Sequence, residues 1–220
     1  MQNLIKTSLL LLTVSFLTFA CKGDKATKAG EAQTVAKSEG TTMSIDNSLS
    51  VINWTGSKPT GSHTGTVKLS SGTVTLNDNK VVGGEFVIDM NTITDTDLDG
   101  DMKANLEAHL KGTVEGKEDD FFNVTKYPTA KFEVTKVVNV VNSENNAVIS
   151  GNLTLKDITK NVSFPANIKN QNGTLSVLSS PFKINRTEWG IKFMSNSFFD
   201  NLKDNFINDD IELQVNVVAR

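Results

Sequence analysis

Apolar and polar side chains alternate along most of the chain after about residue 44. The last segment is the clearest case, because Ile211, Leu213, Val215 and Val217 fall on one side and polar residues on the other. Such a period of two is typical of a strand with one buried face. The same alternation recurs at residues 65–69, 82–90, 147–155, 162–168 and 182–184. The pattern predicts a fold built almost wholly of β-strands.

Residues that favour turns separate these segments. Clusters of Ser, Asn, Asp and Gly lie at residues 70–72, 77–79, 142–146 and 170–173. Many strands at short, regular spacing indicate a β-barrel or a β-sandwich. We favour a closed barrel, because closure removes exposed strand edges and an eight-stranded barrel has an interior that can hold one ligand.

One segment has a helical period instead. Four apolar residues recur at every fourth position: Leu98, Met102, Leu106 and Leu110. Asp95, Asp97 and Asp99 stand at its start, where the helix dipole favours negative charge, and Gly112 follows its end. The spacing predicts one short helix whose apolar stripe packs on the barrel or caps it.

The N-terminus has the features of a targeting segment. Lys6 precedes an apolar run from residue 9 to residue 20, which is too short to span a bilayer and ends directly before Cys21. This arrangement resembles a bacterial lipoprotein signal, in which the cysteine thiol is acylated. We therefore predict a signal peptide at residues 1–20, a lipidated Cys21 with a disordered tether at 21–43, and a folded domain at 44–220.

Composition excludes several classes of function. The chain carries 22 Lys and Arg against 25 Asp and Glu, spread along its length, so we expect no basic face and no nucleic-acid partner. Its single cysteine, used as an anchor, leaves none for a disulfide or a thiolate metal site. Residues 61–65 only superficially resemble a nucleophile elbow, because the central residue is His63. We expect no enzyme activity.

Two patterns raise the question of a metal. The run from Asp95 to Gly100 resembles the start of a calcium loop, but Leu106 stands where the closing acid should be, so an acidic helix start is favoured. The two histidines, His63 and His109, are too few for a zinc site unless acids or thiols lie near them. His109 adjoins the apolar helical stripe and is either packed and hydrogen-bonded or in polar contact with a ligand.

Arg186 continues the alternation of Phe182 and Ile184, which places its side chain among apolar neighbours. A buried guanidinium needs partners, so Arg186 serves either a structural ion pair or the polar end of a ligand cavity. An aromatic cluster follows the helical segment and belongs to the core, to a ligand site, or to both. Its members are Phe121, Phe122, Tyr127 and Phe132.

Taken together and in order, these segments resemble the YceI-like family, the lipocalin-like polyisoprenoid-binding proteins of the bacterial envelope. The matching segments are WTGSK at 54–58, GSHTG at 61–65, GGEFVIDM at 83–90, HLK at 109–111, DFFNV at 120–124, KYPTAKF at 126–132, GNLTLK at 151–156 and INRTEWG at 184–190. The resemblance implies an all-β fold, an extended eight-stranded antiparallel lipocalin-like β-barrel with one short helix. It also implies an elongated apolar pore, often a homodimer, and no established catalytic residues.

On this basis we expect an envelope lipoprotein, periplasmic or anchored to the outer membrane, that carries, stores or senses a lipid without a cofactor or metal. The ligand would be a polyisoprenoid, an isoprenoid quinone or a fatty-chain amphiphile. A packed interaction barrel is the main alternative, and a lipid-modifying enzyme the next. The expected ligand-binding residues are Trp54, Phe86, Ile88, His109, Leu110, Phe121, Phe122, Tyr127, Phe132, Phe164, Phe182, Arg186 and Trp189, with His109, Arg186 and Tyr127 at the head group.

Overall fold

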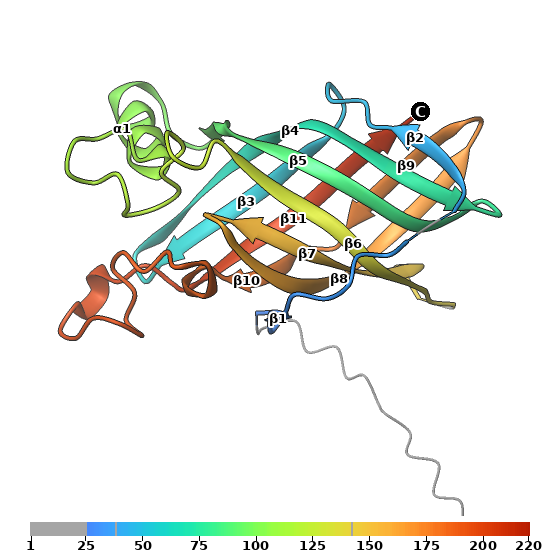
Figure 1. Cartoon of the computed structure of the whole chain (residues 1–220). Coiled ribbons are helices and arrows are strands. Elements are labelled where there is room, and N and C mark those ends of the chain that lie inside the picture. Colours follow the sequence, from blue (N-terminus) through green and yellow to red (C-terminus); the bar gives the residue numbers. More distant parts are fainter. Residues whose placement is uncertain (1–25, 38, 142) are drawn as a thin grey trace, which may run out of the picture.

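The computed structural model describes residues 26–37, 39–141 and 143–220, and most of these lie in strands (Figure 1). The predicted signal peptide and Cys21 lie outside the described residues. The elements are β1 (Gly30–Glu31), β2 (Thr41–Ser44), β3 (Val51–Lys58), β4 (Gly61–Asn77), β5 (Lys80–Asp95), α1 (Gly100–Lys111), β6 (Thr129–Asn139), β7 (Ala147–Leu155), β8 (Ile158–Gln171), β9 (Thr174–Ser179), β10 (Phe182–Asn185), the 3-10 turns η1 (Arg186–Trp189) and η2 (Lys203–Asn205), and β11 (Asp210–Ala219).

Eight strands close into an antiparallel barrel. Strands β3 to β9 pair in chain order, and β11 completes the circle by pairing with both β9 and β3. The register at closure sets Val217 opposite Val177 and Leu213 opposite Trp54. The short β10 pairs with the other half of β11, beyond β9. These pairings confirm the closed barrel that the alternation predicts and the eight strands that the family resemblance implies.

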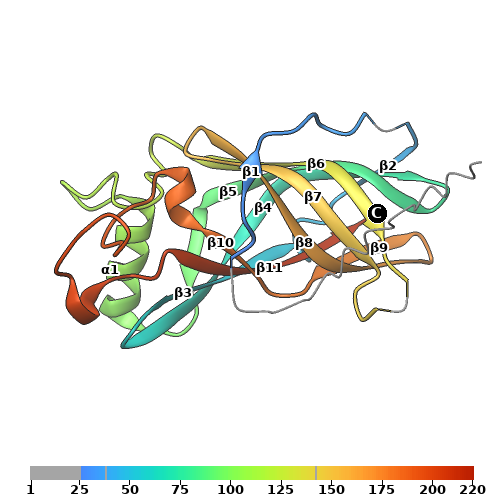
Figure 2. The same ribbon diagram turned by 90° about the horizontal axis from the view of Figure 1, so that it is seen from below.

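The segment before β3 is part of the folded domain rather than a tether. Strand β1 pairs with β8 at Asn161 and Lys160, while the Thr27 N–H donates to the Lys183 carbonyl of β10 over 2.7 Å. This segment therefore bridges β8 and β10, two strands between which no ladder runs in the described part of the chain. Figure 2 shows it lying along the outside of the barrel.

The same segment continues across the outer face. The Gln33 N–H donates to the Asn152 side chain, whose amide donates back to the Gln33 carbonyl, over 2.9 and 2.7 Å. The Ala36 N–H then bonds the Val134 carbonyl, and β2 pairs with β4. The expectation of a disordered tether is thus wrong for residues 26–37 and 39–43, because backbone and amide hydrogen bonds hold them and Ala29 and Met43 pack against the apolar core. We call residues 26–37 and 39–44 the N-terminal strap.

Helix α1 covers one end of the barrel with only part of its predicted stripe. Leu106 and Leu110 are half-buried at the barrel end, whereas Met102 is 66% exposed. Gly112, with φ of 69°, ends the helix as expected and donates its N–H to the Ala108 and His109 carbonyls. Within the described ranges, no helix combines the length and the apolar character needed to cross a lipid bilayer.

The acidic residues near α1 do not all belong to its start. Asp95 is the last residue of β5, and Asp97 lies in the turn after it, where its carboxylate accepts the Thr64 N–H of β4. Only Asp99 stands at the N-cap, and its side chain accepts no capping hydrogen bond. The favoured interpretation of the run as an acidic helix start is therefore wrong for Asp95 and Asp97.

Two aromatic rings lie directly against glycines of the neighbouring strand. A Cβ atom at Gly65 would lie 2.2 Å from the Trp54 ring, and a Cβ at Gly151 would lie 2.2 Å from Cζ of Phe132. Only glycine leaves room for such an approach of ring and backbone. Both rings therefore lie on the barrel wall, which leaves space in the lumen.

We expect Gly151→Val to destabilise the protein by about 2–3 kcal/mol, because the added side chain must displace the Phe132 ring in a packed wall. Urea unfolding followed by tryptophan fluorescence measures this change. The control is Gly56→Val, since a Cβ at Gly56 meets nothing within 4 Å, and it should not destabilise. Adding Phe132→Ala to Gly151→Val should restore part of the loss; a further loss equal to that of Phe132→Ala alone would contradict the ring–glycine contact.

Candidate functional site

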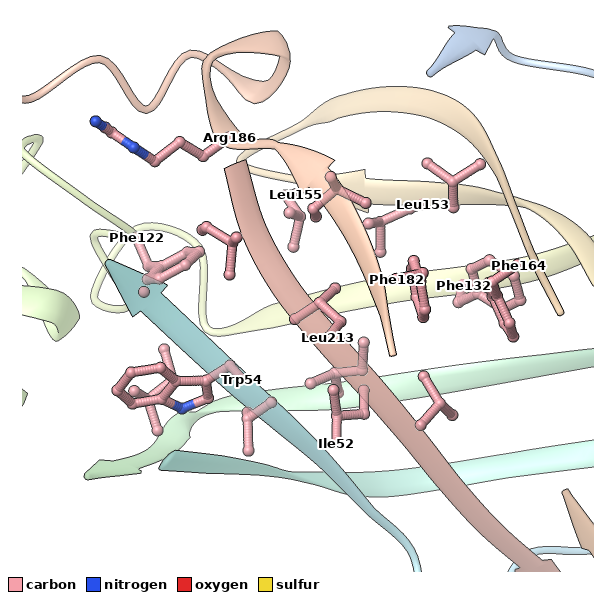
Figure 3. A pocket seen from close by; sticks show the side chains of 18 of the residues that line it. Ile52, Trp54, Phe122, Phe132, Leu153, Leu155, Phe164, Phe182, Arg186 and Leu213 are labelled. Atoms are coloured by element: carbon pink, nitrogen blue, oxygen red, sulfur yellow. The ribbon is translucent and has the colours of Figure 1, made fainter. Parts of the chain in front are cut away.

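The barrel encloses a cavity with a volume of about 370 Å³. Its wall is formed by side chains from all eight barrel strands, with contributions from β10, α1 and the loop after η1 (Figure 3). Nearly all of these side chains are apolar. Those that the sequence also predicted as ligand contacts are Trp54, Phe86, Ile88, Leu110, Phe121, Phe122, Phe132, Phe164, Phe182 and Arg186.

A row of four aromatic rings follows the inside of the wall across β5, β6, β8 and β10. The ring centroids of Phe86 and Phe132 are 6.4 Å apart, those of Phe132 and Phe164 are 5.7 Å apart, and those of Phe164 and Phe182 are 4.5 Å apart. The last pair is stacked, with 13° between the ring planes. These rings give the middle of the cavity a continuous apolar surface that a flexible hydrocarbon chain can contact.

The polar part of the cavity wall lies at the end that carries α1. It comes from the hairpin between β3 and β4, which contributes Ser57, Lys58, Ser62 and His63, and from Asn208 before β11. The hairpin and α1 lie near the same end of the barrel in Figure 1. The cavity is thus apolar along its length and polar at one end, which is the distribution that an amphiphile with a long tail requires.

Arg186 is buried at this end, with 1% of its surface exposed. Its guanidinium donates to the Asn208, Ile191 and Ile207 carbonyls over 3.1, 2.9 and 3.0 Å. Nη2 also lies 3.5 Å from Oδ1 of Asp209. Arg186 therefore holds together the irregular loop between η1 and β11, and part of its side chain also faces the cavity. These contacts are those of the structural alternative, and a role of Arg186 at the polar end of a ligand cavity stays a prediction.

Burial lowers the pKa of Arg186 from its ordinary value, and the charge of Asp209 opposes that effect. An arginine remains protonated in either case, because its ordinary pKa lies far above physiological pH. A permanent positive charge is thus fixed at the polar end of the cavity, with carbonyl oxygens as its main partners.

His109, Tyr127 and Trp189 do not line the cavity, contrary to expectation. His109 Nε2 lies 2.8 Å from Oδ2 of Asp120, and its ring packs edge-on against Phe121 and Phe193, with both centroids 5.0 Å away. This is the packed and hydrogen-bonded alternative for His109.

Trp189 and Tyr127 lie outside the cavity in two different places. Trp189 is fully buried against the wall, where its Nε1–H donates to the Leu153 carbonyl over 3.1 Å. Tyr127 lies in the turn before β6, with Nζ of Lys126 5.0 Å from its ring centroid. The sequence offers their aromatic character and the family resemblance of their segments, and neither separates a ring inside the barrel from one outside.

The structure adds wall residues that the sequence did not single out. Ile52 alternates with Trp54 in β3, so the strand period could have identified it. Ile191 and Ile207 come from the irregular loop after η1, where no period marks an inward side.

Helix α1 is fixed to the barrel through Glu107. Its Oε1 accepts the Thr94 hydroxyl over 2.6 Å and the Asp95 N–H over 3.0 Å, while Lys103 and Lys111 lie 3.9 and 3.6 Å from its carboxylate. Burial alone would raise the pKa of Glu107, but these hydrogen bonds and positive charges lower it below its ordinary value. The ionised carboxylate thus stabilises the docked helix.

Comparisons with known proteins agree with this architecture. A family model described as YceI-like domain matches residues 43–219. Burkholderia cenocepacia BcnA has a similar structure with a TM-score of 0.60, 19% identity, and coverage of 80% of this chain and 99% of its own. A polyisoprenoid binding domain from Saccharophagus degradans gives a TM-score of 0.59, 17% identity, and coverage of 81% and 97%. At these identities the likeness shows the fold. A comparison with curated proteins found no match.

We expect Arg186→Leu to lower the free energy of unfolding by about 3–5 kcal/mol, because it leaves Asp209 and three carbonyls without their buried partner. Urea unfolding measures the loss. Arg220→Leu is the control, since Arg220 is exposed and 3.6 Å from Asp46, and we expect a change below about 1 kcal/mol. Equal losses in the two variants would contradict the structural role of Arg186.

We expect Glu107→Gln to reduce stability at pH 7 by about 1 kcal/mol, because the amide lacks the charge that the hydrogen bonds and lysines favour. A carboxylate with a lowered pKa stabilises above its ordinary pKa, and the effect is lost as the pH falls through the folded-state pKa. The difference from wild type should therefore shrink as the pH falls through the lowered pKa of Glu107 and be lost below it. Thermal unfolding of both proteins from pH 7 into the acid range tests this pH dependence. A stability difference that does not change with pH would contradict it.

Proposed function

This chain belongs to the YceI-like family, and on that basis we propose that its barrel binds a single long apolar lipid along the lumen. The ligand would be a polyisoprenoid, an isoprenoid quinone or a fatty-chain amphiphile. The observation that carries this proposal is the cavity, to whose wall every barrel strand contributes apolar side chains. The polyisoprenoid-binding domain with a similar fold supports the same class of ligand.

The energetics favour this ligand class. Burial of a chain of about fifteen carbons contributes on the order of 10 kcal/mol at roughly 0.8 kcal/mol per CH₂, before the entropic costs of association. A volume of about 370 Å³ lies within the range of small-molecule sites. The packed-barrel alternative requires a filled lumen, which does not agree with this cavity.

The tail would lie along the row of rings from Phe86 to Phe182, and the head group would lie at the polar end. There the fixed charge of Arg186 and the hairpin residues Lys58 and His63 would meet a polar or anionic group. His109 and Tyr127, which the sequence assigns to the head group, do not line the cavity. Lys58 and His63 do line it, so they take this role beside Arg186 in the proposal.

We further propose that the protein is an envelope lipoprotein held to a membrane through acylated Cys21, where it carries, stores or senses its lipid. The signal-like segment at residues 1–20 supports this location. We also propose binding without catalysis, since the cavity wall is mostly apolar and Arg186 is occupied by structural partners. A homodimer is proposed from the family resemblance alone.

Native mass spectrometry of the full chain purified from a bacterial host, with organic extraction, tests lipid binding. Val215→Trp should block the lumen, because Val215 lines the cavity, whereas Asn216→Trp on the opposite face of β11 is the matched control. We expect one lipid per chain in wild type and control, and at least about a tenfold loss in Val215→Trp. An empty wild-type protein that also rejects added quinones and fatty amides would overturn the proposal.

A further inference from the structure

Three potential metal ligands converge beside the polar end of the cavity, although the sequence separates His63 from Asp95 and Asp97 by more than thirty residues. The register between β4 and β5 sets Gly65 opposite Asp95. His63 lies two residues before Gly65, and Asp97 lies two residues after Asp95. The side chains of His63 and Asp97 therefore also lie opposite each other. One ligand atom from each of His63, Asp95 and Asp97 lies within 4.8 Å of the others.

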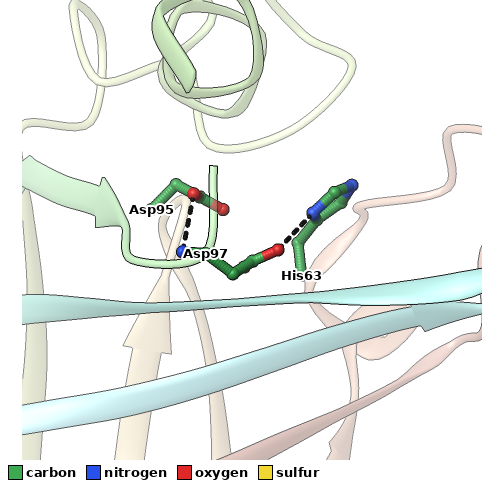
Figure 4. Close-up of side chains that lie close together, drawn as sticks. All are labelled: His63, Asp95 and Asp97. Atoms are coloured by element: carbon green, nitrogen blue, oxygen red, sulfur yellow. Dashed lines mark hydrogen bonds and ion pairs between the residues drawn. The ribbon is translucent and has the colours of Figure 1, made fainter. Parts of the chain in front are cut away.

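Asp95 carries an unsatisfied oxygen in this cluster. Its side chain is fully buried, and Oδ1 accepts the N–H groups of Asp97 and Leu98 over 3.1 and 2.7 Å. Oδ2 is also buried but has no hydrogen-bond partner. Figure 4 shows this second oxygen on the side of the carboxylate that faces His63. A buried carboxylate oxygen without a partner is unfavourable, and a bound cation would satisfy it.

The other two ligands are already oriented. Nδ1 of His63 lies 3.0 Å from Oδ2 of Asp97, while the Thr64 N–H holds Oδ1 of Asp97. Around a tetrahedral ion with bonds of about 2.1 Å, two ligand atoms lie about 3.4 Å apart, so this hydrogen-bonded pair has to open by only a few tenths of an ångström to hold the ion. The side chains of His63 and Asp97 are 37% and 34% exposed, so they can move the short distance that closes the cluster around Asp95.

We propose that His63, Asp95 and Asp97 bind one divalent transition-metal ion, with Zn²⁺ as the representative, at the rim of the lipid cavity. An imidazole nitrogen with two carboxylates suits Zn²⁺ and the neighbouring late transition metals, whereas Ca²⁺ and Mg²⁺ prefer sites made of oxygen alone. Glu107, the acid nearest to a calcium-loop position, is occupied by Thr94 and the Asp95 N–H. Three protein ligands leave at least one coordination position open, and His63 lines the cavity.

The sequence does not predict this site, because its three ligands belong to separate segments of the chain. The sequence places the aspartates at a helix start, and its two histidines are too few for a zinc site unless acids or thiols lie near them. The acids that a zinc site needs lie beside His63 only after β4 and β5 pair in this register.

The full chain, treated with a chelator and dialysed, is titrated with Zn²⁺ by calorimetry and with Co²⁺ by visible absorption. We expect one site per chain, and at least about a tenfold weaker affinity in His63→Gln and Asp95→Asn. His109→Gln is the matched control, because His109 also pairs with an aspartate, Asp120, but belongs to no cluster of three ligands among the described residues. It should bind metal as wild type does.

His63 is partly exposed, so His63→Gln is expected to fold, and urea unfolding verifies this for each variant. The lumen-blocked Val215→Trp should retain the metal, which separates this inference from lipid binding. Absence of stoichiometric Zn²⁺ and Co²⁺ binding would overturn the proposal. So would equal loss in His63→Gln and His109→Gln, or tighter binding of Ca²⁺ than of Zn²⁺.

Discussion

The contact of aromatic rings with bare backbone determines how this barrel can be both stable and hollow. In a filled barrel, large inward side chains meet at the centre and bury one another. Here the Trp54 and Phe132 rings lie on Gly65 and Gly151 of the adjacent strands, so they gain burial from the wall itself. The centre therefore does not need to be filled to keep the wall ordered. The cavity, its apolar character and its length along the barrel all follow from this arrangement.

Two segments outside the eight barrel strands complete the wall where strand pairing is missing. The N-terminal strap bridges β8 and β10 and then crosses the outside to β4. The loop between η1 and β11 lacks regular structure, and a buried charge organises it instead. Arg186 binds three of its carbonyls, which replaces the hydrogen bonds that a strand or helix would have supplied. The polar end of the cavity thus depends on polar contacts, whereas the remainder depends on apolar packing.

The alternation of side chains predicts the barrel and sets Phe86, Phe164 and Phe182 on its apolar faces. The pore itself, and Phe132 within it, follow from the family resemblance and from the aromatic cluster that contains Phe132. Side-chain alternation does not predict the contacts of a segment that has no period, or of one held mainly by backbone hydrogen bonds. Ile191 and Ile207 lie in an irregular loop, and the strap is held by amide and backbone hydrogen bonds that composition does not reveal. Met102 fits the helical stripe, but α1 reaches the barrel only with its later turns.

The attachment of the strap changes the distance at which a membrane anchor could hold the barrel. A free tether from residue 21 to residue 43 could extend to roughly 75 Å, whereas the chain from Cys21 to the first strap hydrogen bond, at Thr27, spans at most about 20 Å. In a chain acylated at Cys21, the standoff from the bilayer would therefore be short, and the flank of β8 and β10 would face the lipid. The attachment of the strap to the barrel wall would then set the orientation of the barrel at the membrane.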